Sequence, residues 1–193
     1  MSLSRMIAVG LTLALVTTAT AARAQYGEAA ARCGVSAGAF LPIDGDTADA
    51  FGSTWWSVAL TYDLPASAME RHRFGLGWIQ SPGNSLRLGN TVWDWEFRMV
   101  PLTYTYLHLP RGGAAGFFLG GGGGVYFTRT ELETITPLAT GVQDDTQTRF
   151  GLHVVAGYAF NSRLAAEARF TKLFEDDNDS NLDGVTLSLA GRF

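Results

Sequence analysis

The stretch Val185-Thr186-Leu187-Ser188-Leu189-Ala190-Gly191-Arg192-Phe193 decides the fold, because apolar residues at most odd positions alternate with polar or small residues at even positions. A period of two residues is typical of a β-strand with one face in an apolar medium and the other in a polar medium. Taken alone, the stretch fits the last strand of a soluble β-sandwich equally well. The sequence before this stretch decides whether the apolar medium is a protein core or a lipid bilayer.

Seven further segments with strand character precede this one. We expect strands at residues 34–41, 54–64, 71–80, 92–108, 116–127, 148–160, 164–171 and 185–193. Long polar connections at residues 43–53, 81–91, 128–147 and 175–184 alternate with short turns. This is the layout of an all-β fold, an eight-stranded antiparallel up-and-down transmembrane β-barrel.

The first 24 residues have the features of a cleaved secretory signal peptide. Arg5 is followed by an apolar run at residues 6–16, and Ala22-Arg23-Ala24 offers a small-x-small cleavage site before Gln25. An anchoring helix would need about 20 apolar residues. The sequence therefore predicts a signal peptide at residues 1–24 and one barrel domain at residues 25–193.

Composition excludes several classes of protein. The net charge is −4, which argues against nucleic acid as a partner. Cys33 is the single cysteine, so an intrachain disulfide is impossible. No apolar run of about 20 residues follows the leader, which argues against a helical membrane protein.

The alternation also assigns charged residues to one face. We expect an interior charge network made of Asp94, Glu96, Arg98, Glu167, Arg169 and Arg192. Arginine facing lipid near the bilayer midplane costs about 2–4 kcal/mol, so the charged face is expected to line the lumen. The apolar phase shifts by one residue at Pro101, which predicts a bulge there.

Aromatic residues are expected at both membrane interfaces. The tryptophans belong to strand ends that bear long loops: Trp55, Trp56, Trp78, Trp93 and Trp95. The ends that bear short turns carry Tyr62, Tyr104, Tyr106, Tyr158 and Phe193.

Five consecutive glycines at residues 120–124 interrupt a predicted strand. A phosphate-binding loop would need a following Lys-Ser/Thr pair and a helix, which are missing. We expect the glycines to allow neighbouring strands to approach closely.

Three motifs carry a resemblance to a known family. They are Val100-Pro101-Leu102-Thr103-Tyr104, the glycine-rich segment 118–126, and Leu164-Ala165-Ala166-Glu167-Ala168-Arg169-Phe170-Thr171. With the terminal residues 188–193, the chain resembles the small Gram-negative outer-membrane barrels of the opacity-protein, OmpX and OmpW-like kind. The resemblance implies an integral protein of the cell outer membrane, expected as a monomer. Its implied partners are outer-membrane lipids, lipopolysaccharide and the barrel-insertion machinery, which would read the C-terminal strand with Phe193 as the assembly signal.

Catalysis is not expected, and no cofactor is predicted. Some small barrels are lipid A-modifying enzymes, and the deacylase type carries a His-x-Ser motif on a lipid-facing strand. None of His72, His108 and His153 has that spacing. His153 falls on the interior face, where a hydrogen-bonded lumen residue is the favoured interpretation over a catalytic base.

One loop resembles part of a calcium site. Asp179, Asn181 and Asp183 alternate before Gly184, as in the first half of an EF-hand loop. Ala190 stands where the bidentate carboxylate belongs, so only weak divalent-cation binding is considered.

The functional prediction is an integral outer-membrane barrel with a structural or surface-interaction role and a plugged, charged interior. The first alternative is a narrow pore for small or hydrophobic solutes, and the second is a lipid A-modifying enzyme. An eight-stranded lumen is only just wide enough to be filled by side chains, which favours the plugged barrel.

Overall fold

The structure, a computed structural model, describes residues 31–110, 115–137, 139–174 and 181–193. The predicted signal peptide at residues 1–24 lies outside the described residues. The elements follow in the order β1 (Arg32–Pro42), α2 (Gly45–Phe51), β2 (Trp55–Pro65), β3 (Glu70–Gln80), β4 (Asn84–Leu88), β5 (Thr91–His108), β6 (Gly116–Ile135), β7 (Thr140–Ala159), β8 (Leu164–Leu173) and β9 (Gly184–Arg192). No helix among these residues is long and apolar enough to cross a membrane.

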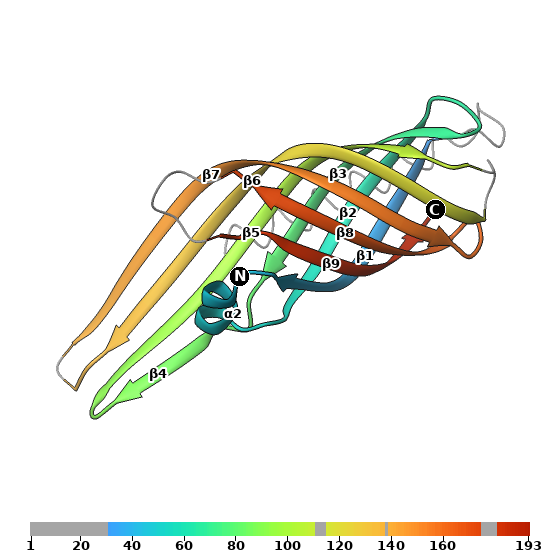
Figure 1. Ribbon diagram of the computed structural model, residues 1–193. Helices are drawn as coiled ribbons and strands as arrows, with labels where there is room; N and C mark the ends of the chain where they lie inside the picture. The colour runs from blue at the N-terminus through green and yellow to red at the C-terminus, as the bar shows by residue number, and fades with distance from the viewer. Residues whose placement is uncertain (1–30, 111–114, 138, 175–180) are drawn as a thin grey trace.

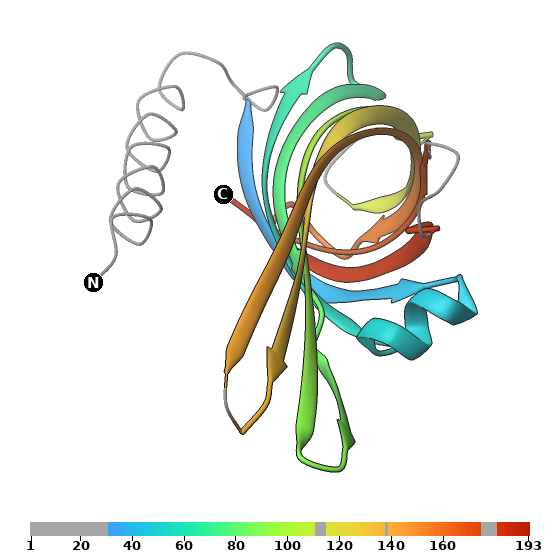
Figure 2. The same ribbon diagram turned by 90° about the vertical axis from the view of Figure 1, so that its left-hand side faces the viewer.

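Eight of the strands form a closed antiparallel ring. The order is β3-β2-β1-β9-β8-β7-β6-β5, and pairing of β3 with β5 closes it. Figure 2 shows the ring nearly along its axis. The terminal strand β9 pairs with β1, and the backbone of Phe193 exchanges hydrogen bonds of 2.9 and 3.2 Å with that of Cys33. The predicted eight-stranded up-and-down barrel is confirmed.

The outer face of the ring is apolar. Large exposed side chains occur on every strand of the ring, for example Val35, Val58, Leu76, Leu102, Leu119, Leu152, Phe170 and Leu189. A protein in water would leave such a continuous apolar band uncovered, whereas a bilayer covers it. The outward face therefore meets lipid.

The long connections are more ordered than the sequence predicts. Residues 43–53 contain α2, whose N-cap Asp44 accepts a hydrogen bond of 2.9 Å from the Thr47 backbone N–H. Residues 81–91 contain β4, which forms a hairpin with β5. The expected loop at 128–147 is instead largely strand, because β6 and β7 stay paired as far as Ile135 and Thr140.

Two hairpins consequently extend beyond the ring. They are the β6–β7 ribbon (residues 128–135 and 140–147) and the β4–β5 hairpin (residues 84–95). Both project from the same end as α2, as Figure 1 shows. We call this the ribbon end. The opposite end carries the β2–β3 turn, the β7–β8 turn and Phe193, and we call it the turn end.

The predicted bulge at Pro101 is wrong. The β5–β6 register runs without a break from Val92↔Ile135 to His108↔Leu119. The odd positions of β5 face inward throughout, so Phe97 and Met99 are buried just as Thr103 and Thr105 are. The inward-facing side chains of β5 change from apolar to polar at Pro101. In the sequence, this change looks like a shift of the apolar alternation by one residue.

Glycines bring neighbouring strands close together. A Cβ atom on Gly122 would lie 1.9 Å from the Tyr104 carbonyl oxygen, and one on Gly38 would lie 1.9 Å from the Leu187 carbonyl oxygen. No larger residue fits without moving the backbone. The glycine run is thus strand within β6, as the close-approach interpretation requires.

Candidate functional site

The lumen contains a cluster of buried ion pairs centred on Arg73. Its guanidinium donates to Asp63 through Nε at 2.6 Å and Nη2 at 3.0 Å, and to both Glu167 oxygens through Nη1 at 2.8 and 2.9 Å. Arg192 Nη2 donates to Glu167 Oε1 at 3.4 Å. All four residues are at most 9% exposed.

The strand order explains how this cluster crosses the lumen. Asp63 and Arg73 are direct partners on the neighbouring strands β2 and β3. Glu167 comes from β8, which is separated from β3 in the ring by β2, β1 and β9 on one side and by β7, β6 and β5 on the other. A pair between β3 and β8 therefore spans the interior of the barrel at that level.

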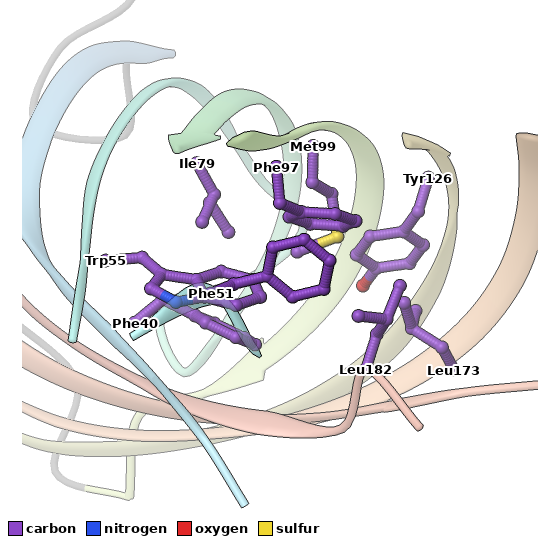
Figure 3. Close-up of a cluster of buried hydrophobic side chains, with 9 residues drawn as sticks. All are labelled: Phe40, Phe51, Trp55, Ile79, Phe97, Met99, Tyr126, Leu173 and Leu182. Atoms are coloured by element: carbon purple, nitrogen blue, oxygen red, sulfur yellow. The ribbon is translucent and has the colours of Figure 1, made fainter. Parts of the chain in front are cut away.

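Two apolar clusters fill the lumen on either side of a polar layer. The cluster at the ribbon end consists of Phe40, Phe51, Trp55, Ile79, Phe97, Met99, Tyr126, Leu173 and Leu182, all drawn in Figure 3. The cluster at the turn end consists of Leu107, Leu109, Phe118, Val155, Ala159, Ala165 and Ala190. Along β5 to β8, the residues between the two clusters are polar or small: Thr103, Thr105, Gly122, His153, Glu167 and Arg169.

Helix α2 contributes to the cluster at the ribbon end. Phe51 packs edge-on against Trp55, with ring centroids 6.3 Å apart, and contacts Phe97 at 5.5 Å. The Thr47 hydroxyl donates to the Asn181 carbonyl oxygen at 2.9 Å, which fastens the helix to the connection before β9. The helix therefore adds its own aromatic side chain to the cluster at this end of the barrel.

The structure divides the six residues of the predicted interior network into two groups. Glu167, Arg169 and Arg192 lie in the lumen. Asp94, Glu96 and Arg98 do not, because even positions of β5 face outward at the ribbon end. The expected pairing of Glu167 or Arg169 with the charges of β5 is therefore corrected.

Arg98 and Glu96 form their own ion pair at the rim of the barrel. Arg98 Nη2 donates to Glu96 Oε2 at 2.7 Å, and both side chains are about one third exposed, at 33% and 32%. This hydrogen bonding raises the pKa of Arg98. The pair lies apart from the lumen cluster and is accessible to solvent.

Sequence reasoning missed Asp63 and Arg73 as members of the network. Arg73 belongs to the same face of its strand as Gly75 and Gly77, and Asp63 continues the face of Ser57 and Thr61. In the sequence, the strict alternation along these two strands is the signal that places Asp63 and Arg73 on the inward face. The register that makes the two residues cross-strand partners was not available from sequence.

The predicted tryptophan girdle is only partly present. Trp56 and Trp78 are exposed on the outer face, at 48% and 36%. Trp55 is fully buried in the cluster at the ribbon end, and Trp95 packs against that cluster. At the turn end, Tyr104, Tyr106, Tyr158 and Phe193 are all exposed.

A row of carboxylates crosses the projecting strands. Glu96 lies directly opposite Glu131, which lies opposite Asp144, and Asp94 lies opposite Glu133. A hollow of about 420 Å³ is lined by Asp94, Glu96, Glu131 and Glu133 together with Asn84 and Ser85. Arg129 partly compensates these charges through Asp144, at 2.9 Å. Like charges directly opposite one another destabilise strand pairing, so the acidity of this surface has an energetic cost.

The side chains of Asn181 and Asp183 in the proposed divalent-cation loop form hydrogen bonds with other groups of the protein. Asp183 is buried, and its carboxylate accepts from the Leu173 backbone N–H at 2.9 Å and from Lys172 Nζ at 2.8 Å. The Asn181 side chain accepts from the Asp183 N–H at 2.9 Å. Asp179 lies outside the described residues. Within the described ranges, no group of three or more acidic, histidine or cysteine residues could hold a metal ion.

The three histidines are far from one another in environment. His72 Nδ1 contacts the Tyr104 hydroxyl at 2.7 Å on the outer face, and His108 is exposed. His153 is buried in the lumen with Nε2 2.7 Å from Thr105 Oγ1. This hydroxyl–imidazole pair is enclosed between the apolar clusters.

Closed ring, apolar outer band and polar lumen together define an eight-stranded barrel of the outer-membrane type. Three solved structures have the same fold. The N-terminal β-barrel domain of OprF from Pseudomonas aeruginosa is 10% identical, with a TM-score of 0.53 over 84% of this chain and 97% of that one. Ail, the attachment invasion locus protein of Yersinia pestis, is 9% identical, with a TM-score of 0.55 over 84% and 96%. A major outer membrane protein from Thermus thermophilus is 16% identical, with a TM-score of 0.54 over 84% and 99%.

At these identities the comparisons establish the fold of the chain and no particular activity. No protein-family model matches the sequence, and no curated protein matches it. The expectation that the insertion machinery reads Phe193 stays a prediction.

Proposed function

We propose that the chain is an integral outer-membrane protein with a closed, non-conducting barrel and a surface-interaction role carried by its ribbon end. Arg73 carries the first half of this proposal. Its bonds to Glu167 cross the lumen, and apolar clusters lie on both sides of the polar layer. An ion that entered from either end would have to displace packed aromatic or aliphatic side chains.

The projecting strands support the second half of the proposal. The β6–β7 ribbon and the β4–β5 hairpin present their edges and outward faces well beyond the ring (Figure 1). With both facing outward from the cell, their carboxylates would lie beside the anionic sugar phosphates of lipopolysaccharide. Bridging cations would then be needed for close contact.

A non-catalytic barrel also agrees with the position of the buried histidine. His153 and Thr105 are 2% and 0% exposed. A lipid substrate reaches a barrel enzyme from the outer face, from which this pair is screened by the strands. The His153–Thr105 pair is therefore not accessible to a lipid substrate from that face. The exposed pair of His72 with Tyr104 joins a histidine to a phenol and lacks the serine of the deacylase motif.

Single-channel recording tests the closed lumen. The refolded protein is added to planar bilayers, and the heat-dependent gel shift of the same sample measures how much protein is folded. We expect folded wild-type protein to give no conductance steps. Regular steps from wild-type protein would overturn the closed barrel and favour the narrow pore.

Binding of purified lipopolysaccharide tests the surface role. Binding to detergent-solubilised protein is measured with and without magnesium ions, for wild type and for a Glu131→Gln/Glu133→Gln double variant. We expect magnesium-dependent binding that the double variant weakens. A Thr130→Gln variant, on the same strand but without a charge, is the matched control and should bind like wild type. Equal binding by all three proteins would remove the acidic face from the proposal.

A further inference from the structure

At the level of the polar layer, the lumen contains more positive than negative charge. The carboxylates there are Asp63 and Glu167, and the guanidinium groups are those of Arg73, Arg192 and Arg169. The buried Arg149 and Asp183 lie beside the cluster at the ribbon end. Both carboxylates are committed to Arg73, and Glu167 also to Arg192. In the part of the chain that the structure describes, Arg169 forms no hydrogen bond and no ion pair.

Arg169 faces a small cavity in the lumen whose lining is partly polar and partly apolar. The cavity has a volume of about 50 Å³, and the side chains around it include Ser57, Thr61, Thr103 and Ser188. Glu167 also borders it, but Arg73 and Arg192 occupy the carboxylate oxygens. One water needs about 10–15 Å³ of such space, so the cavity admits a single monatomic ion or a few waters and excludes organic anions.

The polar layer is also short of acceptors. Two buried polar atoms of the lumen have no hydrogen-bond partner within the described residues: His153 Nδ1 and Arg192 Nε. Arg192 Nε–H is a donor. His153 Nδ1 is a donor when Thr105 donates to Nε2, as their 2.7 Å contact allows. The lumen therefore contains unused donors as well as a cation without a direct partner.

A charge that is partly buried and lacks a direct partner is costly, and an oppositely charged partner reduces that cost. We propose that the lumen binds a small monatomic anion of the halide class in this cavity, with Arg169 as its counter-charge and the serine and threonine hydroxyls as additional donors. The site is independent of the surface role, since it lies inside the closed barrel.

Replacement of the anion tests the site. Urea unfolding of refolded protein in detergent is followed by the heat-dependent gel shift, in sodium chloride, sodium bromide or sodium gluconate at equal ionic strength. A ligand that binds only the folded state raises the unfolding midpoint as its concentration rises. We expect a higher midpoint for wild type in chloride and bromide than in gluconate, and a midpoint that rises with chloride concentration.

The variant Arg169→Gln should lose this halide dependence. The matched control is Arg87→Gln on the exposed strand β4, which should keep it. If Arg169→Gln does not fold, crystals of wild type grown in sodium bromide still decide, because bromide gives an anomalous scattering peak beside the Arg169 guanidinium. Equal wild-type midpoints in chloride and gluconate, or a lumen that holds only water in the bromide crystals, would overturn the proposal.

Discussion

Arg73 Nη1 donates to both carboxylate oxygens of Glu167, at 2.8 and 2.9 Å, across the full width of the barrel. Neighbouring strands of a barrel are held by backbone hydrogen bonds, but β3 and β8 are not neighbours. This contact therefore links opposite walls of the barrel through buried side chains.

Removal of Arg73 is the strongest test of that contact. Arg73→Ala leaves Asp63 and Glu167 buried without their main partner, and breaking a buried pair costs about 3–5 kcal/mol. We expect a large fall in the urea midpoint of the folded band on gels. Arg98→Ala is the control, since its pair with Glu96 is one third exposed and such pairs contribute at most about 1 kcal/mol. Similar effects of the two variants would indicate a wet, wide lumen.

Two adjacent glycines of β6 give a matched test of strand approach. A Cβ at Gly122 would lie 1.9 Å from the Tyr104 carbonyl oxygen, whereas the nearest heavy atom to a Cβ at Gly121 is 3.7 Å away. We expect Gly122→Ala to lower the yield of folded barrel and its urea midpoint, by about 1–3 kcal/mol or more. Gly121→Ala should behave like wild type. Normal folding of the Gly122 variant would show that β5 and β6 can separate without loss.

The orientation in the membrane can be read by cysteine labelling. In a Cys33→Ser background, Gly141→Cys places a thiol on the β6–β7 ribbon and Ser162→Cys places one in the turn before β8. If the ribbon end faces outward, an impermeant maleimide added to intact cells will modify the first and not the second. Both should react after the cells are broken. The reverse pattern on intact cells would invert the assigned orientation.

The pairing of Asp94 with Glu133 predicts that the projecting strands gain stability when one charge is reversed. Opposite charges on paired strands contribute about 0.2–1 kcal/mol, and like charges cost a similar amount. We expect slower amide hydrogen exchange in the ribbon for Glu133→Lys than for wild type, with Glu133→Gln between them. The difference should shrink at high salt because the groups are exposed to solvent. Unchanged exchange in the Lys variant would mean that the carboxylates are already neutralised.

The sequence predicts the barrel well because lipid enforces a strict alternation on its strands. Every strand of the ring lies where the apolar period of two places it, and β9 pairs with β1 as closure demands. The lumen follows no such rule. Phe97 and Met99 point inward as members of the aromatic cluster at the ribbon end, whereas Thr103 and Thr105 point inward nearer the turn end. The apolar character of a β5 residue therefore does not show whether its side chain faces lipid or the lumen.

The same ambiguity explains the error over the charge network. Asp94, Glu96 and Arg98 alternate with large apolar residues just as lumen residues do, but they belong to the part of β5 that approaches and passes the rim. There the outer face meets water, so charges carry a smaller desolvation cost than in lipid. Where a strand leaves the membrane cannot be read from its period. Asp63 and Arg73, in contrast, needed the register between β2 and β3 to be recognised as partners.

The unbroken register of the projecting strands has a mechanical consequence. From the membrane to the tip, β6 and β7 continue as one ladder of backbone hydrogen bonds without a bulge, and β5 accompanies them for much of that length. Such a ladder contains no obvious hinge. A force applied at the tip would be transmitted along this ladder to the barrel wall, where Gly122 lets β6 approach β5 closely. The β6–β7 ribbon should therefore behave as a rigid extension of the barrel wall, and the surrounding lipid should hold the barrel in place.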